Sequence, residues 1–419
     1  MVSKTNSSIL LSSLLLIILI YSGAVKLPKD SLTALIPEKE VSSFTGKIIS
    51  NPVKSSDSYY TAKIKFNSVS SDKISSSANG VKTVLIPVKI IEAFYPGKLY
   101  SRNNSDSKLI PLEQGVIITC TVNSFLNKDG EASFILKKIN ESYFEKGFSS
   151  FFYRLRALCR IQFKRLMMLW GSAGGFLLAL LSGSKEYLDG KLINCFRMSG
   201  LSHILALSGM HLSLISSLAG VVENKSALKK AGLFIRVLTI IIFVWFAGLS
   251  PSLLRALISV LIVSLCTLIH IPKINSLVLL CTTFLIHTVV CPDDLFNLAF
   301  LFSYSALAGI LILSGMVKAL ISGFIPSAAV DNLSASIGAN IFTTPISLKV
   351  FGYFSPGGII STLVVSPVIT VFLYMGIVLL TLSLCFPAFA VLAGSLMNVI
   401  YWFISKMVEF WSFIPQVSF

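Results

Sequence analysis

Hydrophobic and polar residues follow two different patterns along the chain. Between about Val41 and Ile139, apolar residues alternate with polar ones in short runs that Ser, Asn, Asp and Gly clusters separate. A period of two predicts strands, because successive side chains of a strand point to opposite faces. From about Gly174 onward, apolar runs of roughly 14 to 25 residues follow one another, and most could cross about 30 Å of hydrocarbon. The pattern therefore predicts a small β domain followed by membrane helices.

Five runs in the first region read as strands: "FTGKIIS", "YYTAKIKF", "VKTVLIPVKI", "GVIITCTV" and "ASFILKKI". Five short strands within about 100 residues suit a small closed or partly open barrel, and the OB type is the leading prediction. A β-sandwich is the alternative. We assign residues 36–142 to this domain.

The amino-terminal residues 1–30 combine one early lysine, an apolar run from Ile9 to Ile20 and the small residues Ser22, Gly23 and Ala24. A cleaved signal peptide and an uncleaved transmembrane anchor both fit this pattern. Either one would export the β domain.

The predicted membrane domain covers residues 171–419, with about seven or eight spans. Its apolar segments are Gly174–Leu181, Leu201–Gly220, Gly232–Gly248, Leu253–His270, Leu277–Val290, Leu295–Leu313, Ile337–Phe354, Ile359–Leu384 and Phe389–Val408. The first is too short to span and should be re-entrant or partly inserted. The basic loop "VENKSALKKAGLFIR" is expected in the cytoplasm by the positive-inside rule.

Composition supports the membrane assignment. Of 419 residues, 54% are hydrophobic and 13% are charged, a balance that a soluble fold could not hide in one core. The net charge of +16 is partly a topology signal and also fits a polyanionic partner or anionic lipid. Together these features predict a polytopic α-helical membrane protein with an amino-terminal anchor and an exported, OB-like β-barrel domain.

Residues 145–170 form a basic segment between the two domains. In "SFFYRLRALCRIQFKRLMMLW", Arg and Lys alternate with Phe, Leu and Met at near-helical spacing. This pattern is typical of an amphipathic helix on the membrane surface. Contact with phosphates, of lipid or of nucleic acid, is a second interpretation.

The apolar stretch "HILALSGMHLSL" holds His203, Ser208, Gly209 and His211. Glycine weakens a helix and permits an unwound turn, so we expect a broken helix whose polar groups line a cavity. The alternative is that each histidine bonds a neighbouring helix. No metal site is expected, because carboxylate and cysteine ligands are missing nearby and His270 and His287 lie on other segments.

Further polar or special residues interrupt the later apolar segments. Arg255 could snorkel to the interface, or point into a pore and offer a phosphate a fork of donors. Phe300 and Ser303 belong to a stretch of aromatic and polar residues, where packing in the core or against lipid competes with base stacking. Pro367 lies inside a long apolar segment and implies a kink.

Taken in order, these stretches resemble the ComEC competence-protein family, the inner-membrane channel through which single-stranded DNA enters bacteria during natural transformation. The stretches that carry the resemblance are "GLSHILALSGMHLSLI", "SPSLLRAL", "AFLFSYSALAGI" and "TLVVSPVIT". The resemblance implies that His203, Ser208, Gly209 and His211 shape the signature channel segment. It implies that Arg255, Phe300, Ser303 and Pro367 are further channel positions.

The sequence departs from that family in three ways. Leu301 stands where the family has glutamine, and Thr362 stands where it has asparagine. No His-x-His-x-Asp-His cluster is found, so we expect a form without the family's metallo-β-lactamase-like nuclease domain. Transport also needs a driving force, and no Gly-x-x-x-x-Gly-Lys motif occurs, so a separate cytoplasmic motor and a separate nuclease are expected partners.

The predicted function is therefore a channel for single-stranded DNA in the bacterial cytoplasmic membrane, surrounded by membrane lipids. The expected DNA contacts in the exported part are Tyr59, Tyr60, Phe66, Tyr95, Tyr100, Arg154, Arg156 and Arg160. The alternative is a transporter or lipid-binding protein that shares the fold. An enzyme is not expected, because neither His-Glu-x-x-His nor Gly-x-Ser-x-Gly occurs, and we predict no catalytic residue, cofactor or metal.

Overall fold

The computed structural model describes residues 2–22, 33–34, 36–54, 58–71, 75–92, 112–126, 132–207, 209, 211–216, 229–271, 274–324 and 326–418. The chain forms two compact units. The β-rich unit is Pro28–Met168 with Ser184–Glu186. The helical unit is Met1–Leu27, Leu169–Gly183 and Tyr187–Phe419.

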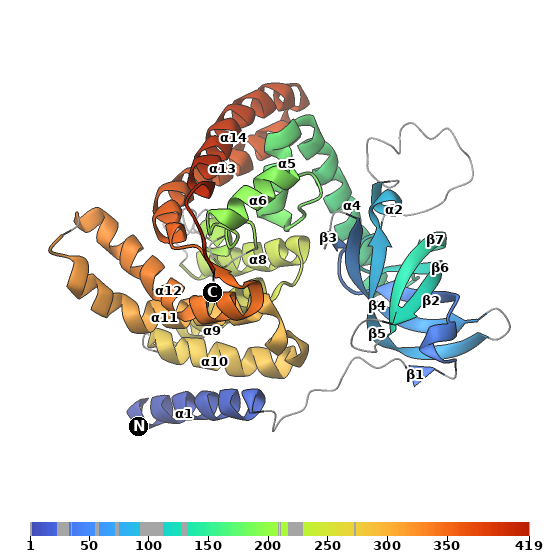
Figure 1. Ribbon diagram of the computed structural model, residues 1–419, viewed down its shortest axis with the longest axis horizontal. Helices are drawn as coiled ribbons and strands as arrows, with labels where there is room; N and C mark the ends of the chain where they lie inside the picture. Colours follow the sequence, from blue (N-terminus) through green and yellow to red (C-terminus); the bar gives the residue numbers. More distant parts are fainter. Residues whose placement is uncertain are drawn as a thin grey trace. The chain divides into compact units, whose positions relative to one another are not determined.

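The β-rich unit contains strands, two short helical elements and one long helix (Figure 1). They are β1 (Thr33–Ala34), η1 (Glu38–Glu40), β2 (Ser43–Ile48), β3 (Val53–Lys54), β4 (Tyr59–Ser70), β5 (Ser75–Pro87), α2 (Val88–Glu92), β6 (Val116–Leu126), β7 (Ala132–Phe144) and α4 (Phe148–Leu169).

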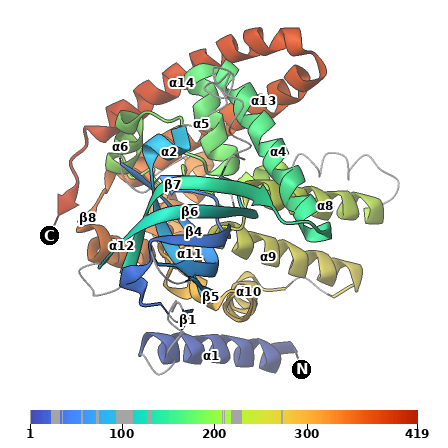
Figure 2. The same cartoon turned by 90° about the vertical axis from the view of Figure 1, so that its right-hand side faces the viewer.

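These strands form one sheet in the order β1-β5-β7-β6-β2-β4-β3, in which β5 also pairs with β4. Figure 2 shows β7 and β6 side by side. Most neighbours are antiparallel, whereas β5 and β7 pair in parallel at Val84 with Phe134 and at Leu85 with Ile135. The structure confirms that an amino-terminal β domain precedes a mostly helical part of the chain. The OB-type barrel stays a prediction.

The core of the β-rich unit follows from alternation along the strands. On β4, Tyr60, Ile64 and Phe66 are buried, while Lys63 and Lys65 are exposed. Phe66 packs against Phe44 with ring centroids 4.3 Å apart and against Phe134 at 5.4 Å. Burying one such side chain stabilises the fold by roughly 1.5–3 kcal/mol, so the apolar face of each strand is held inside.

The helical unit contains the remaining elements. They are α1 (Val2–Tyr21), α5 (Gly171–Ser182), α6 (Gly190–Met198), α8 (Lys229–Ala247), α9 (Pro251–Leu268), α10 (Ser276–Val290), η2 (Pro292–Phe296), α11 (Leu298–Ile321), α12 (Ser327–Phe351), β8 (Tyr353–Phe354), α13 (Gly357–Cys385), η3 (Pro387–Phe389), α14 (Ala390–Ser412) and β9 (Val417–Ser418).

Helix α5 lies in the interior of the helical unit. Residues 173–182 are all buried, and the ring of Phe176 packs against those of Phe196, Phe372 and Tyr401. The side chain of Asn398 on α14 completes this packing, since it accepts from the Ala173 amide at 3.1 Å and donates to the Trp170 carbonyl at 2.8 Å. One amide side chain thus satisfies the Ala173 N–H in the first turn of α5, where N–H groups lack partners within the helix, and the Trp170 carbonyl directly after the end of α4.

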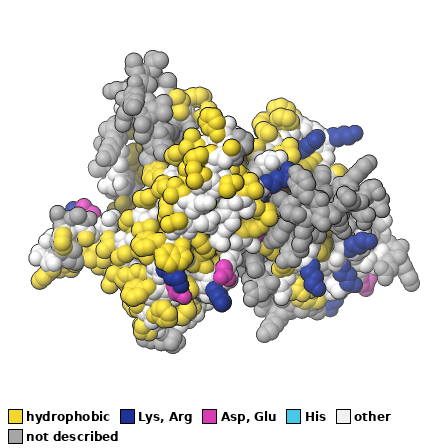
Figure 3. Space-filling model, turned by 90° about the horizontal axis from the view of Figure 1, so that it is seen from above, with side chains coloured by type: hydrophobic (Ala, Val, Ile, Leu, Met, Phe, Trp, Pro, Cys, Tyr) yellow, Lys and Arg dark blue, Asp and Glu magenta, His cyan; other side chains and the backbone are white. Residues whose placement is uncertain are grey.

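By length and composition, four described helices could cross a membrane: α9, α11, α13 and α14. Sequence reasoning predicts seven or eight spans. Part of the difference lies in shorter apolar helices such as α10, whose 15 residues rise only about 22 Å at 1.5 Å per residue. Helix α12 has 25 residues and is not among the four. Hydrophobic side chains cover much of the face of the helical unit in Figure 3. Such a surface is expected where lipid, not water, surrounds the protein.

Helices α11 and α12 pack closely as an antiparallel pair (Figure 1). Their backbones approach at Gly309 and Gly338. A Cβ atom added at Gly309 would clash with the carbonyl oxygen of Gly338. Small residues at a crossing let membrane helices approach this closely, so the pair depends on the missing side chain.

We expect Gly309→Ala to destabilise the helical unit by about 1–3 kcal/mol, because the added methyl group forces the two backbones apart. The matched control is Gly315→Ala on the same helix, where an added Cβ meets nothing within 4 Å. That variant should be neutral or stabilising, since alanine favours a helix over glycine by about 1 kcal/mol. Thermal unfolding of the detergent-solubilised chain measures both, and equal midpoints would contradict the prediction.

Candidate functional site

A cavity of about 510 Å³ lies within the helical unit. Two arginines and four serines form its polar lining, and the rest of the wall consists of a glycine and aliphatic side chains. The lining residues are Gly209, Leu212, Ser213, Ser216, Arg236, Arg255, Ala256, Ser259, Val260, Ser276, Leu279, Leu280, Leu307 and Leu311. No carboxylate is among these lining residues.

Two motifs that lie far apart in the sequence meet at this cavity. A Cβ atom added at Gly209 would lie 3.0 Å from Nη2 of Arg255 and 3.5 Å from Cβ of Ala256. The glycine of the Ser-Gly-x-His stretch therefore packs directly on the Arg-Ala pair of α9. Sequence reasoning names both motifs without predicting this contact.

Hydroxyl groups accompany the two guanidinium groups. Nε of Arg236 donates to Oγ of Ser216 at 2.6 Å. Ser259 donates to the Arg255 carbonyl at 3.0 Å and lies 3.2 Å from Oγ1 of Thr283, which is fully buried. Nε of Arg255 is buried, and within the described part of the chain it has no hydrogen-bond partner. The cavity is thus positively charged, with hydroxyls along one side.

The signature histidines do not line the cavity. His203 is exposed, and its Nδ1 lies 3.2 Å from the carbonyl oxygen of Gly200. His211 is completely buried, and residues 209 and 211–216 are helical. Turns and bends occupy residues 202–206, so the irregular segment precedes Gly209, where the sequence predicts an unwound turn. Ser208 lies outside the described residues.

Of the other expected channel positions, Phe300 is buried, Ser303 is partly buried on α11, and Pro367 is exposed on α13. None of the three lines the cavity. The ring of Phe300 lies edge-on to His287, with centroids 4.9 Å apart.

Sequence reasoning missed the partners of His287. This imidazole is fully buried, with Nδ1 3.2 Å from the hydroxyl of Tyr304 and Nε2 3.2 Å from the carboxylate of Asp294. Asp294 follows His287 by seven residues, and Tyr304 lies one turn beyond Phe300. These spacings were only a weak indication that the three side chains would meet. No group of three or more potential metal ligands occurs in the part of the chain that the structure describes.

Comparison with known proteins decides the family. Residues 180–419, more than half of the chain, match the family described as Competence protein. This chain belongs to the competence protein family. The matched region includes the whole lining of the cavity.

A relative within the curated proteins is ComE operon protein 3 of Bacillus subtilis (strain 168), which is 24% identical over 217 residues. The match covers 51% of this chain and 27% of that protein, so the chain spans about a quarter of the relative's length. No solved structure matches the chain.

In this competence-family protein, the aromatic candidates of the β-rich unit fall into three groups. Tyr60 and Phe66 lie in the core, with 1% and 0% of their surface exposed, and offer no stacking surface in the folded unit. Tyr59 is partly exposed on the other face of β4. Tyr95 and Tyr100 lie outside the described residues.

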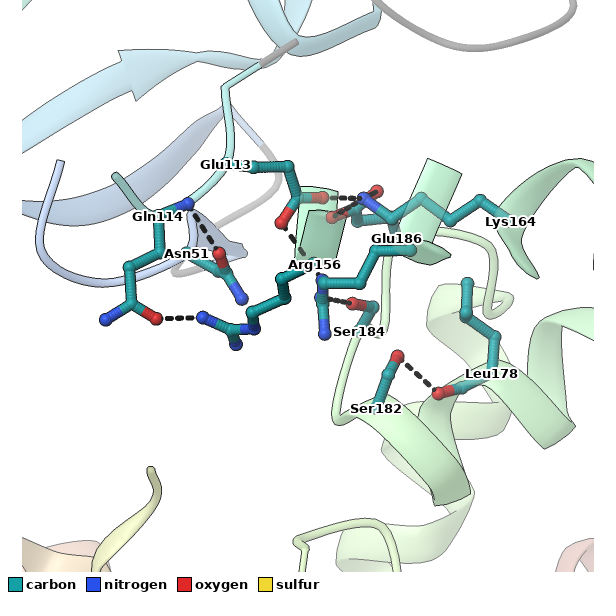
Figure 4. A network of polar contacts seen from close by, with 10 residues as sticks. Asn51, Glu113, Gln114, Arg156, Lys164, Leu178, Ser182, Ser184 and Glu186 are labelled. Atoms are coloured by element: carbon teal, nitrogen blue, oxygen red, sulfur yellow. Dashed lines mark hydrogen bonds and ion pairs between the residues drawn. The ribbon is translucent and has the colours of Figure 1, made fainter. Parts of the chain in front are cut away.

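The basic candidates are placed by α4. Arg154 is exposed, whereas Arg156 and Arg160 are buried. Their spacing of four residues puts them on one helix face, which lies against Glu113 and Gln114 (Figure 4). The outer face instead carries exposed Phe148 and Phe151. Of the three arginines that we expected to contact DNA, Arg156 and Arg160 are thus buried within the β-rich unit.

Glu113 is the centre of this buried ion cluster. Its carboxylate lies 3.0 Å from Nε of Arg160 and 3.2 Å from Nζ of Lys164, and Lys164 is also 3.4 Å from Glu186. Burial raises the pKa of Glu113, but the charges of Lys164 and Arg160 outweigh it and hold this pKa below its ordinary value. Burial lowers the pKa of Lys164, and Glu113 and Glu186 more than reverse this, so its pKa is raised.

We expect Glu113→Gln to destabilise the β-rich unit by about 3–5 kcal/mol, because it leaves two buried cations without their carboxylate. The control is Glu145→Gln, whose carboxylate is 60% exposed and pairs with Lys47 at 3.3 Å. That pair should contribute about 0–1 kcal/mol. Hydrogen exchange of β6 and α4 in the full chain measures both changes.

The same cluster predicts a pH dependence. The folded pKa of Glu113 is depressed, so its stabilisation is present above the carboxyl's unfolded pKa and is lost as pH falls through the folded value. Lys164 adds stabilisation that is present below its unfolded pKa and is lost as pH rises through its raised folded pKa. Exchange protection should therefore hold at neutral pH and fall in acid. The acid step should shrink in Glu113→Gln, and an unchanged step would show that other groups cause it.

Proposed function

We propose that this membrane protein conducts single-stranded DNA across the bacterial cytoplasmic membrane as a multi-pass channel. The observation that carries the proposal is the Arg255-lined cavity. It lies inside the region that matches the competence family, where the signature glycine meets α9.

The lining of the cavity suits a polyanion. Each nucleotide of a DNA strand brings one negative phosphate, and cationic side chains neutralise these charges. A carboxylate on the wall would repel them, and the described lining has none. The aliphatic side chains, among them Leu279 and Leu307, give sugar and base a surface without fixed hydrogen-bond partners. This combination favours passage of a strand over recognition of one sequence.

We further propose that the β-rich unit is an exported OB-type barrel that receives the strand. Tyr59, Lys63 and Lys65 alternate along β4 on the face opposite the core, and Arg154 is exposed on α4. OB folds bind oligonucleotides over the face of their central strands, with aromatic stacking and basic side chains. The two lysines replace Arg156 and Arg160 in this role, because both arginines are buried, Arg156 beside Gln114 and Arg160 against the Glu113 carboxylate.

The proposed channel works with other proteins. A separate cytoplasmic motor would pull the strand, and a separate nuclease would supply a single strand from duplex DNA. Anionic lipids would surround the helical unit. The channel itself then contributes a path and no covalent chemistry.

We expect deletion of the gene to abolish entry of labelled DNA into the cytoplasm while DNA binding at the cell surface continues. Gly209→Leu should reduce entry at least tenfold, because the larger side chain fills the space beside Arg255. Gly315→Leu is the control, since its site is open. Membrane levels of each variant are measured alongside. Unchanged entry in the deletion strain would contradict the proposal and favour a transporter or lipid-binding protein of the same fold.

A further inference from the structure

We infer that the cavity in the helical unit is a binding site for a phosphate group, held by the guanidinium of Arg255 with Arg236 beside it. The inference deepens the proposed function, since it names the chemical group that the same cavity binds. It requires only equilibrium binding, so it can hold even where no DNA is transported.

The guanidinium of Arg255 is a charged group with a buried nitrogen that lacks a hydrogen-bond partner among the described residues. Arg255 lies in the first turns of α9, one of the four helices that could cross a membrane. The buried nitrogen is its Nε atom. An arginine keeps its charge in a protein, so it cannot avoid the cost of burial by losing a proton. A ligand that accepts hydrogen bonds and brings negative charge would satisfy this group.

The described residues that line the cavity with Arg255 do not supply that negative charge, because none of them is a carboxylate. The hydroxyl of Tyr304 interacts with Arg255 electrostatically, but a neutral phenol does not bring the negative charge of a carboxylate. That phenol lies 3.2 Å from Nδ1 of the buried His287, so it already has a polar neighbour. Arg255 differs in this from Arg160 and Lys164, which both contact the Glu113 carboxylate. Arg156 also has buried nitrogens without a hydrogen-bond partner among the described residues, but Glu113 interacts with it electrostatically.

Arg236 brings a second positive charge to the cavity. It lines the same cavity as Arg255, and its Nε donates to Ser216 at 2.6 Å, which fixes the orientation of the guanidinium plane. Two like charges that share a cavity without a carboxylate repel one another. A bound phosphate, which carries at least one negative charge and several acceptor oxygens, turns this repulsion into attraction for both.

Hydroxyl groups and space complete the site. Ser216 and Ser276 line the cavity and offer hydroxyl groups to phosphate oxygens, whereas Ser213 and Ser259, also in the lining, donate to the carbonyls of Gly209 and Arg255. The volume of about 510 Å³ exceeds the needs of one phosphate, and the aliphatic wall leaves room for an attached sugar and base or for an acyl glycerol. Gly209 keeps the approach to Arg255 open, because a Cβ there would lie 3.0 Å from Nη2.

The same phosphate chemistry occurs in the DNA backbone and in the headgroup of a phospholipid. A test must therefore present both. The probe for the first source is a short oligothymidylate, the probe for the second is phosphatidylglycerol in a nanodisc, and inorganic phosphate reports the site without either.

The experiment is a binding titration of the purified full-length chain in nanodiscs of neutral lipid. We expect saturable binding of inorganic phosphate and of oligothymidylate. Arg255→Gln should weaken both at least tenfold, and Arg255→Lys should weaken them less, because lysine keeps the charge and loses the planar fork of donors. The control is Lys318→Gln, which removes an exposed positive charge that pairs with Asp331 elsewhere in the unit. It should bind as the unaltered chain does.

The source of the phosphate follows from nanodiscs that contain phosphatidylglycerol. If the lipid headgroup occupies the cavity, this lipid should compete with inorganic phosphate in the unaltered chain and not in Arg255→Gln. If DNA is the natural ligand, oligothymidylate should bind equally well in both lipid mixtures. Each result supports a phosphate site and separates the two sources.

Two results would overturn the inference. One is the absence of phosphate and oligothymidylate binding by a chain whose thermal unfolding shows it to be folded. The other is binding that Arg255→Gln and Gly209→Leu leave unchanged. Loss of DNA entry in cells with normal phosphate binding, or the reverse, would separate this inference from the proposed transport function.

Discussion

The close contact between Gly209 and α9 is the constraint on which the helical unit's polar interior depends. With no side chain at residue 209, the backbone comes within reach of Arg255 and Ala256, and the two arginines and four serines then face one space. A larger residue would push the guanidinium aside. The glycine of the signature stretch thus acts through its neighbour on another helix, in addition to any effect on its own helix.

Most other polar groups in this unit are satisfied where they stand. Asn398 serves the start of α5, His287 lies between a phenol and a carboxylate, and many Ser and Thr hydroxyls donate to the carbonyl four residues before them. Buried polar groups are normally paired, because an unpaired one loses its hydration without compensation. Among the described residues of this unit, Nε of Arg255, Nε1 of Trp170 and Oγ of Ser383 are buried without a hydrogen-bond partner, and of these three residues Arg255 lines the cavity.

Local patterns predicted much of this fold. Long apolar runs located α9, α11, α13 and α14, and alternation located the strands. The side on which a residue faces was harder to predict. Alternation separates Tyr59 from Tyr60, yet only the packed sheet decides that Tyr60 lies inside.

Contacts between distant segments explain the remaining differences. Helical spacing groups Arg156 with Arg160, but Glu113, which turns that face inward, lies 47 residues before Arg160. In the same way, the Ser-Gly-x-His and Arg-Ala motifs could each be found in the sequence, while their contact depends on how α9 packs. The site was therefore predictable as a set of residues, and its geometry was not.

The bridge from Asn398 to the start of α5 has a consequence for how the protein is made. The amide of Ala173 meets its partner 225 residues later in the chain. At about 5–20 residues per second, a ribosome needs on the order of 10–45 s to synthesise that interval. During this time the newly made α5 must shelter its open amino end by other means, with the translocon or a membrane chaperone as candidates. Helix α5 is thus made early, and the hydrogen bond to its first turn can form only after Asn398 of α14 has been made.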